Sequence, residues 1–379
     1  DPTEPWRSGP FPYPALEHEP RIQQLNDDLK NLGYHPSPLP MGIRLGYEDG
    51  EEGYTTNLNL LGQFDGFPDP TESKADAHVI GVRHALRHEN VMLKTHSYVE
   101  RLVTDGSGRK VTGVVVRQED GTEVVYSAGY VIVAAGAINS AALFLRSKNN
   151  KHPNGLANSS GLVGSNYMSN NNATFIAISH EPNDSVFEKT LALADFYWGD
   201  EEFKYPMGYI QMLGKVDETA MMFEAPQPFK GMTYAEMAAH SLDFWLQSED
   251  LPDPNNRVTV DVEGRIHFHF KRNNIEAHQH LADKLKSLLN SIGCHEHLIE
   301  VNHYLGTQFE FNLAHEMGTM KMGIDPKTSV LDTYNRPHDL ENVFVTDGCF
   351  FVSSGSVNPT LTILAQTLRV ADFIKREVF

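Results

Sequence analysis

Cysteine, positive charge and long apolar runs are all scarce in this sequence of 379 residues. Its two cysteines are too few for a disulfide framework, and their spacing fits neither a zinc nor an iron–sulfur site. The 31 Lys and Arg against 50 Asp and Glu give a net charge of −19, which repels phosphate backbones and argues against a nucleic-acid partner. The longest apolar stretch, around residues 131–138, is far shorter than the roughly 20 residues that cross a bilayer, so we expect no membrane span.

A signal peptide is also missing from the start of the sequence. Residues 1–14 are rich in proline and have neither a charged nor an apolar region of the kind that export signals carry. Such a start is typical of connecting chain, so we expect the sequence to begin inside a larger polypeptide. We expect a cytoplasmic location, and the sequence leaves open whether an upstream part carries an export signal.

Hydrophobic periodicity predicts a mixed α/β protein. Short β-rich runs between residues 91 and 127, separated by the turn signals Asp105-Gly-Ser-Gly and Asp120-Gly, predict an antiparallel β-meander. Residues 130–137 predict a buried strand that leads into a helix, which is the context of a nucleotide site. Residues 46–73 predict a long irregular loop, either a lid or a mobile surface loop. Helices are expected near residues 21–32, 73–88, 139–146, 277–292 and 359–376.

The middle of the chain, residues 165–310, mixes strand patterns with one helix. Residues 257–262 and 265–270 predict two strands joined by the turn Glu263-Gly264. This stretch is typical of an antiparallel sheet with helices on it, and we expect it to form a second domain.

The C-terminal helix has a marked start and one apolar face. Asn358 stands at the N-cap position and Pro359 at the first helical position. The start of such a helix offers unpaired N–H groups and partial positive charge, which stabilise an anion or a developing negative charge. An ordinary capped core helix is the alternative. The face that we expect to be buried consists of Leu361, Leu364, Ala365 and Leu368.

His315 is the candidate base. It is followed by Gly318 and Thr319, whose small side chains allow a substrate to come close. Imidazole titrates near neutral pH and can take a proton from an alcohol. A lone histidine is more often structural, but its pairing with Asn358 favours a catalytic role.

Five short motifs follow one another in a fixed order along the chain. They are Val131-Ile-Val-Ala-Ala-Gly136-Ala-Ile-Asn-Ser140, His315-x-x-Gly318-Thr319 with Met322-Gly323, Asp332, Val345-Thr-Asp347-Gly and Asn358-Pro359-x-x-Thr362. In order and spacing the chain resembles the glucose–methanol–choline (GMC) family of flavoprotein oxidoreductases. Within the family it is most similar to the branch of pyranose oxidases and glycoside 3-oxidases, which pairs a His with an Asn as here.

The resemblance implies a role for each matching position. His315 is the expected general base, and Asn358 the second hydrogen-bonding partner of the substrate hydroxyl. The cofactor is expected to be FAD. Its ribityl and pyrophosphate part is expected at Asp347 and Gly348, and its pyrimidine edge at the backbone of Pro359 and Thr360. The remaining expected contacts are Val99 near adenine and Ala135 and Gly136 near the nucleotide.

The resemblance also implies the domains and the reaction. Residues 1–72 would be a connecting segment with a lid-like loop, residues 73–164 and 311–379 the FAD-binding domain with an incomplete Rossmann-like half, and residues 165–310 the substrate-binding domain. We expect oxidation of a secondary hydroxyl of a sugar or glycoside, at C2 or C3, to a keto-sugar, with dioxygen or another electron acceptor. A flavin-containing lyase that uses His315 as acid and base, and a non-catalytic flavoprotein subunit, are the alternatives.

One feature of the GMC family is absent from this sequence. The family binds the FAD diphosphate with an N-terminal Gly-x-Gly-x-x-Gly motif, whereas Gly106-Ser-Gly108 lacks the third glycine and lies in a hairpin. We therefore expect the chain to be the C-terminal portion of a GMC enzyme, complemented by an N-terminal chain that carries the dinucleotide-binding motif.

Metal binding is not expected. His267 and His269 place two imidazoles on one face of a strand, and His295 and His297 do the same. With 18 histidines in the chain such pairs arise by chance, and no Cys or carboxylate set completes a coordination geometry.

Overall fold

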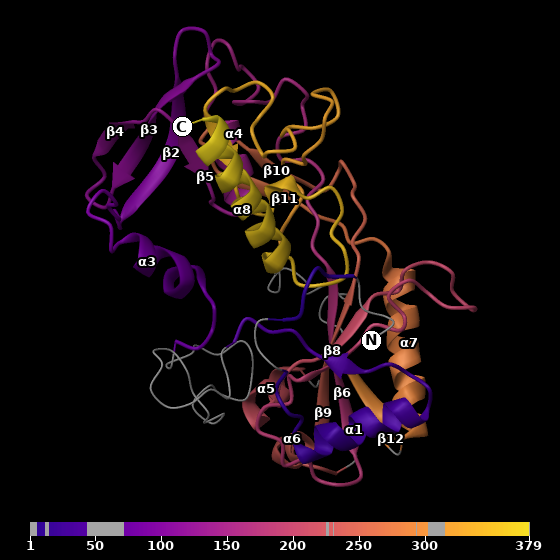
Figure 1. Ribbon diagram of the computed structural model, residues 1–379. Coiled ribbons are helices and arrows are strands. Elements are labelled where there is room, and N and C mark those ends of the chain that lie inside the picture. The colour runs from indigo at the N-terminus through magenta and orange to yellow at the C-terminus, as the bar shows by residue number, and fades with distance from the viewer. Residues whose placement is uncertain are drawn as a thin grey trace. The chain divides into compact units, whose positions relative to one another are not determined.

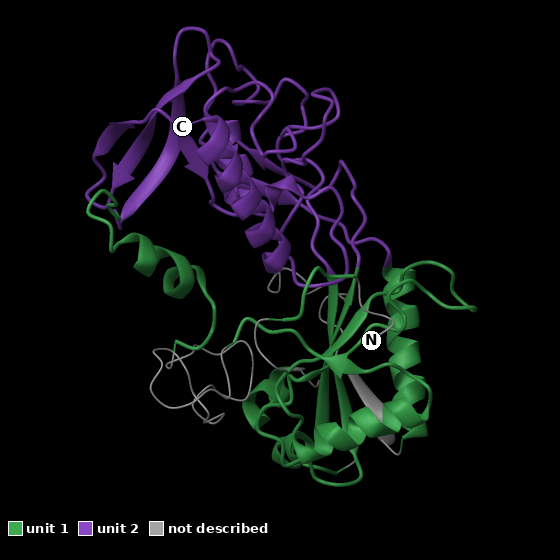
Figure 2. Ribbon diagram, in the orientation of Figure 1, with its two compact units in different colours: residues 1–93, 171–248, 275–312 green, residues 94–170, 249–274, 313–379 purple. Residues whose placement is uncertain are grey.

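A computed structural model describes most of the chain. The described residues are 6–11, 15–43, 72–224, 227–229, 231–292, 294–301 and 315–378. The predicted loop of residues 46–73 lies outside this part, apart from its last two residues. The chain divides into two compact units (Figure 2). Unit 1 comprises residues 1–93, 171–248 and 275–312, and unit 2 comprises residues 94–170, 249–274 and 313–379.

Unit 2 contains the predicted β-meander, the strand and helix near residue 136, and the C-terminal strand and helix. β2 (Ser97–Thr104), β3 (Val111–Gln118) and β4 (Glu123–Ser127) form an antiparallel sheet, and β5 (Val131–Val133) pairs in parallel with β13 (Val343–Val345). A hairpin joins β10 (Arg257–Val260) to β11 (Ile266–His269). The helices are α4 (Ala137–Arg146) and α8 (Thr360–Glu377), and a short 3-10 turn covers Gly348–Phe350 (Figure 1).

α8 exposes the face that the sequence pattern predicts to be buried, so that prediction is wrong. Leu361 and Leu368 are 75% and 71% exposed, whereas Val370 is fully buried. The helix packs instead through its other side, where Phe373 stacks on Tyr334 with ring centroids 4.1 Å apart. The predicted start is also shifted by one residue, because Pro359 occupies the N-cap position and its carbonyl accepts the N–H of Ile363.

Two further predictions, a buried strand and a long helix, also differ from the structure. The strand predicted to be buried, β5, leaves Ile132 58% exposed, although parallel sheets are normally covered on both faces. The helix predicted over residues 73–88 is shortened to a π-helical turn at His78–Val82 followed by α3 (Arg83–Ala85). In both places the pattern marks an apolar face, but that face is exposed in the described part of the chain.

Unit 1 is built on one antiparallel sheet with helices on both faces. The sheet order is β1, β7, β8, β9, β6, β12. Phe175 and Ala177 of β6 pack with α1 (Pro20–Asn31) and α7 (Ile275–Ser291), while Ile176 and Ile178 pack with α5 (Glu218–Glu224) and α6 (Tyr234–His240) (Figure 1). The strands are β1 (Ser37–Pro38), β6 (Asn171–Ser179), β7 (Leu191–Leu193), β8 (Tyr209–Met212), β9 (Ser241–Ser248) and β12 (Cys294–Val301). No described helix is long and apolar enough to cross a bilayer, and the cytoplasmic location stays a prediction.

A buried charge cluster lies in this unit. Lys215 Nζ is 3.5 Å from Glu188 Oε1, and Asp243 Oδ2 accepts the N–H of Val216 at 3.0 Å. Glu188 and Asp243 are both 0% exposed. One lysine faces two carboxyl groups that water does not reach, so ionising both would leave an uncompensated buried charge. Burial accordingly raises the pKa of Glu188 to about 8 and the pKa of Asp243 to about 6.

We expect the free energy of unfolding of the chain to fall between pH 5 and pH 8. Folded Glu188 keeps its proton up to about pH 8, whereas the unfolded chain releases it near its ordinary pKa of 4.5. The stabilising contribution is therefore complete below the unfolded pKa and is lost as the pH rises through the folded one. At about 1.4 kcal/mol per unit, the change between pH 5 and pH 8 is on the order of 4 kcal/mol, and urea denaturation measures it. Glu188→Gln should flatten this decline and the exposed control Glu276→Gln should not; equal slopes in all three proteins would contradict the assignment.

Candidate active site

An antiparallel backbone pairing brings His315 next to Asn170. The N–H of Met168 donates to the carbonyl of Met317 at 2.9 Å, and the N–H of Met317 donates back to Met168 at 3.0 Å. In this antiparallel register Asn170, two residues after Met168, comes to lie opposite His315, two residues before Met317. Two stretches that are almost 150 positions apart in the sequence therefore meet within unit 2.

The imidazole of His315 is held between two amide side chains. Its Nδ1 is 2.9 Å from Asn170 Oδ1, and Asn358 Nδ2 is 3.2 Å from its Nε2. His315 has a backbone φ of 63°, in the left-handed region that non-glycine residues seldom adopt and that recurs at functional sites. The structure thus places the two predicted catalytic residues within hydrogen-bond distance of each other.

The predicted nucleotide-side residues form a second hydrogen-bonded group. Asp347 is 7% exposed, and its Oδ2 accepts the N–H of Gly136 at 3.0 Å and the hydroxyl of Ser140 at 2.5 Å. Its Oδ1 accepts the N–H of Cys349 at 2.9 Å, and Ser140 Oγ also accepts the N–H of Ala135 at 3.1 Å. Asp347 therefore ties the end of β5 and the start of α4 to the residues that follow β13.

The two groups are joined through Gly348. The N–H of Gly318 donates to the carbonyl of Gly348 at 3.0 Å. A Cβ built on Gly348 would stand 2.5 Å from the backbone oxygen of Glu316, so only glycine allows this approach. The spacing between the His315 segment and the Asp347 segment is therefore fixed by direct backbone packing.

The other predicted cofactor residues lie at the edges of this arrangement. Pro359 is buried and Thr360 is exposed at the start of α8. The N-cap position of α8 has no side-chain hydrogen bond to its first turn. Val99 lies on β2, outside the hydrogen-bonded groups, with its half-buried side chain packed against the hydrophobic core of unit 2.

Sequence reasoning missed the residues behind His315. Asn170, Asp250 and Ser354 are 0%, 0% and 4% exposed, and none was a candidate. A signal does exist: residues 169–172 read Ser-Asn-Asn-Asn at the start of a strand that is buried along its whole length. Four consecutive polar residues that enter a core need partners. What the sequence cannot supply is the identity of those partners.

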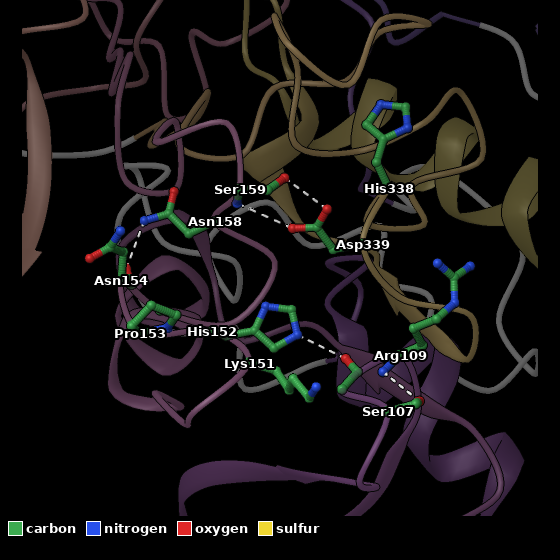
Figure 3. A pocket seen from close by; sticks show the side chains of 12 residues that line it. Ser107, Arg109, Lys151, His152, Pro153, Asn154, Asn158, Ser159, His338 and Asp339 are labelled. Carbon is green, nitrogen blue, oxygen red and sulfur yellow. Dashed lines mark hydrogen bonds between the residues drawn. The ribbon is translucent and has the colours of Figure 1, made fainter.

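A separate polar cavity lies elsewhere in unit 2. It has a volume of about 400 Å³ and holds neither His315 nor Asn358 (Figure 3). Asp339 accepts the hydroxyl of Ser159 at 2.8 Å there, and the imidazole of His152 is 2.8 Å from the carbonyl of Gly108. Within the described ranges, no three His, Cys, Asp or Glu side chains gather in a way that could hold a metal ion. The cavity therefore lies apart from the His315 group, which holds the two predicted catalytic residues.

Comparison with known proteins gives one consistent family. Two family models, both described as GMC oxidoreductase, match residues 19–170 and 251–367. The chain is 26% identical to 6'''-hydroxyparomomycin C oxidase of Streptomyces lividus, covering 94% of this chain and 64% of that protein. It is also 26% identical to the fructose dehydrogenase large subunit of Gluconobacter japonicus, covering 98% of this chain and 69% of that protein. The chain thus spans about two thirds of the length of these relatives.

A solved structure supports the same fold. Pyridoxine 4-oxidase from Mesorbium loti matches with a TM-score of 0.56 at 16% identity, over 95% of this chain and 70% of that one. At this identity the match speaks for the fold alone. The predicted mixed α/β fold class is confirmed.

We expect Gly348→Ala to destabilise the chain. Its new Cβ would meet the backbone oxygen of Glu316 at 2.5 Å, so one of the two segments must move. We expect a loss of about 1–3 kcal/mol in the free energy of unfolding, the usual range for overpacking. Gly129→Ala is the control because its Cβ would meet nothing within 4 Å. Urea denaturation of both variants measures the difference, and equal stabilities would show that the close approach is not real.

Proposed function

Because the chain belongs to the GMC oxidoreductase family, whose cofactor is FAD, we propose that it forms part of an enzyme that oxidises a CH–OH group of a sugar or glycoside. The finer proposal is a secondary hydroxyl, at C2 or C3, converted to a keto-sugar. The names of the two relatives support a sugar-like substrate, since one is a 6'''-hydroxyparomomycin C oxidase and the other a fructose dehydrogenase large subunit. Dioxygen or another acceptor would reoxidise the flavin.

The observation that carries this proposal is the contact between His315 and Asn358. His315 Nε2 and Asn358 Nδ2 are 3.2 Å apart, so a hydroxyl oxygen that approaches both atoms from one side would meet a base and a hydrogen-bond donor together. His315 would take the hydroxyl proton, which weakens the neighbouring C–H bond toward hydride loss. Asn358 would hold the oxygen in place while the proton leaves.

The described residues fit the flavin side of such a site. When bound, FAD supplies the acceptor for the hydride at its N5 atom. Gly136 has open space where a side chain would stand, and a φ of 84° that favours glycine, so its backbone can lie against a ligand. We propose that Ala135, Gly136, Asp347 and Gly348 would hold the ribityl and nucleotide part.

The remaining proposed contacts are at the start of α8 and on β2. The pyrimidine edge of the flavin would face Pro359 and Thr360, and adenine would lie near Val99. The first turn of α8 has no side-chain cap, so its N–H groups remain available to an anion. Negative charge at that edge would be stabilised by these groups and by the helix dipole.

A partner segment completes the proposal, because the diphosphate motif is not in this sequence. We propose that a dinucleotide-binding segment outside this sequence packs on unit 2. Ile132 of β5 and Leu361 and Leu368 of α8 support this, since their 58%, 75% and 71% exposure leaves apolar surface facing water on a strand and a helix that each have a packed opposite side. The segment would cover this surface and supply the glycine-rich turn.

We expect His315→Ala to keep bound FAD but to slow its reduction by sugar at least about 100-fold, the usual scale for losing a general base. The measurement is the anaerobic decay of flavin absorbance after mixing with substrate. His269→Ala, an exposed histidine of the same unit, is the matched control and should leave the rate unchanged. An unaltered rate in His315→Ala would remove this residue from the mechanism. Failure of every sugar to bleach the wild-type flavin would favour the lyase or the non-catalytic subunit.

We expect Leu361→Ser together with Leu368→Ser to weaken the flavin-bound assembly at least tenfold. The two substitutions remove apolar surface that the proposed segment would bury. The readout is flavin content after gel filtration, with a denaturing gel and intact mass to identify any companion polypeptide. Ser substitution at Leu93 and Met92 in unit 1, also exposed, is the control. Full flavin content in the α8 double variant would contradict the proposed docking.

A further inference from the structure

We propose that Asn170 is a positioning residue that fixes the imidazole of His315 in its Nδ1–H tautomer and leaves Nε2 as the base. The inference rests on the proposed function, because it assigns how the base of that reaction is oriented. It is argued from hydrogen bonds that all lie within unit 2.

The orientation of the Asn170 amide is set by a backbone carbonyl. Asn170 is 0% exposed, and its Nδ2 donates to the carbonyl of Gly355 at 2.7 Å. A carbonyl oxygen can only accept, so the NH₂ group must face Gly355 and the Oδ1 must face the other way. The side of Asn170 that meets His315 is therefore an acceptor.

This orientation decides which ring nitrogen of His315 carries the proton. Asn170 Oδ1 is 2.9 Å from Nδ1, and an acceptor at that distance requires an N–H on Nδ1. In the neutral imidazole Nε2 then has a lone pair. Asn358 Nδ2, a donor, lies 3.2 Å from Nε2, which agrees with an unprotonated nitrogen there. The Asn170 amide thus selects this tautomer, and the placement of Asn358 Nδ2 agrees with it. It is the tautomer that a base for an alcohol needs.

A buried shell holds Asn170 and Gly355 in register. Ser354 Oγ donates to the carbonyl of Asp250 at 3.0 Å and accepts the Asp250 N–H at 2.8 Å. Asp250 Oδ2 accepts the N–H of Ser169 at 3.1 Å, and Arg272 Nη1 donates to the carbonyl of Asn170 at 3.0 Å. Asp250 therefore joins Ser169, which precedes Asn170, to Ser354, which precedes Gly355. This links the Asn170 segment to the Gly355 segment without any contact to the reacting atoms.

The neutrality of Asn170 has a consequence for the base. A carboxylate at this position would favour the imidazolium and raise the pKa of His315. The charged groups around the shell are Arg272, which faces Asp250, and Asp253 nearby, and burial raises the pKa of Asp250 to about 7. An amide orients the ring without adding the negative charge that would favour the imidazolium.

The test uses the flavin-bound protein with ¹⁵N-labelled histidine. Long-range ¹H–¹⁵N spectra, with the His315 signals assigned by their loss in His315→Gln, report which ring nitrogen is protonated. The wild type should show a protonated Nδ1 and an unprotonated Nε2.

Asn170→Leu should give a mixture of tautomers and slow flavin reduction about 10- to 100-fold, the scale for partners behind a ligand or base. Asn170→Asp should shift the acidic limb of the rate profile upward by about one pH unit.

Asn154→Leu and Asn154→Asp, at an exposed position, are the matched controls and should change neither spectrum nor profile. A wild-type spectrum with the proton on Nε2, or an Asn170→Leu protein that keeps the wild-type tautomer, would overturn the assignment. If Asn170→Leu does not fold, the wild-type spectrum and the Asn170→Asp profile decide. Loss of the proposed function would appear separately, as an unchanged reduction rate in His315→Ala, because the nitrogen spectrum does not depend on turnover.

Discussion

The antiparallel pairing of Met168 with Met317 is the constraint on which the rest of the site depends. Its two hydrogen bonds, 2.9 and 3.0 Å long, place Asn170 opposite His315. The close approach of Gly348 to Glu316 then sets this pair beside the Asp347 group. Neither contact needs a charged side chain. Backbone packing in unit 2 thus positions the imidazole of His315 beside a buried amide and next to the Asp347 group.

Buried polarity is used differently in the two units. In unit 1 the Glu188, Lys215 and Asp243 cluster lies between the sheet and its helices and links local folding to pH. In unit 2 the Asp250 shell ends at an imidazole that faces a second amide. Only the second presents a titratable nitrogen next to a hydrogen-bond donor, which is why it supports the proposed chemistry.

Local patterns predicted the β-meander and the family motifs correctly and the exposure of the neighbouring apolar faces wrongly. Gly318, Asp347 and Asn358 stand in motifs whose order is diagnostic, and turn signals located the β-meander correctly. The exposure of Leu361, Leu368 and Ile132 could not be foreseen, because periodicity shows which face is apolar but not whether another segment covers it. Asn170 was not predicted for another reason. Its contact with His315 depends on the pairing of two segments that are distant in the sequence, and no local motif indicates that pairing.

The most direct measurement is a crystal structure of the flavin-bound protein with a sugar in the site. We expect the reacting hydroxyl oxygen within hydrogen-bond distance of both His315 Nε2 and Asn358 Nδ2, with its carbon over the flavin N5 atom and the start of α8 at the pyrimidine edge. A sugar bound away from His315, or a flavin whose ring lies on a different side of unit 2 from these two residues, would contradict it.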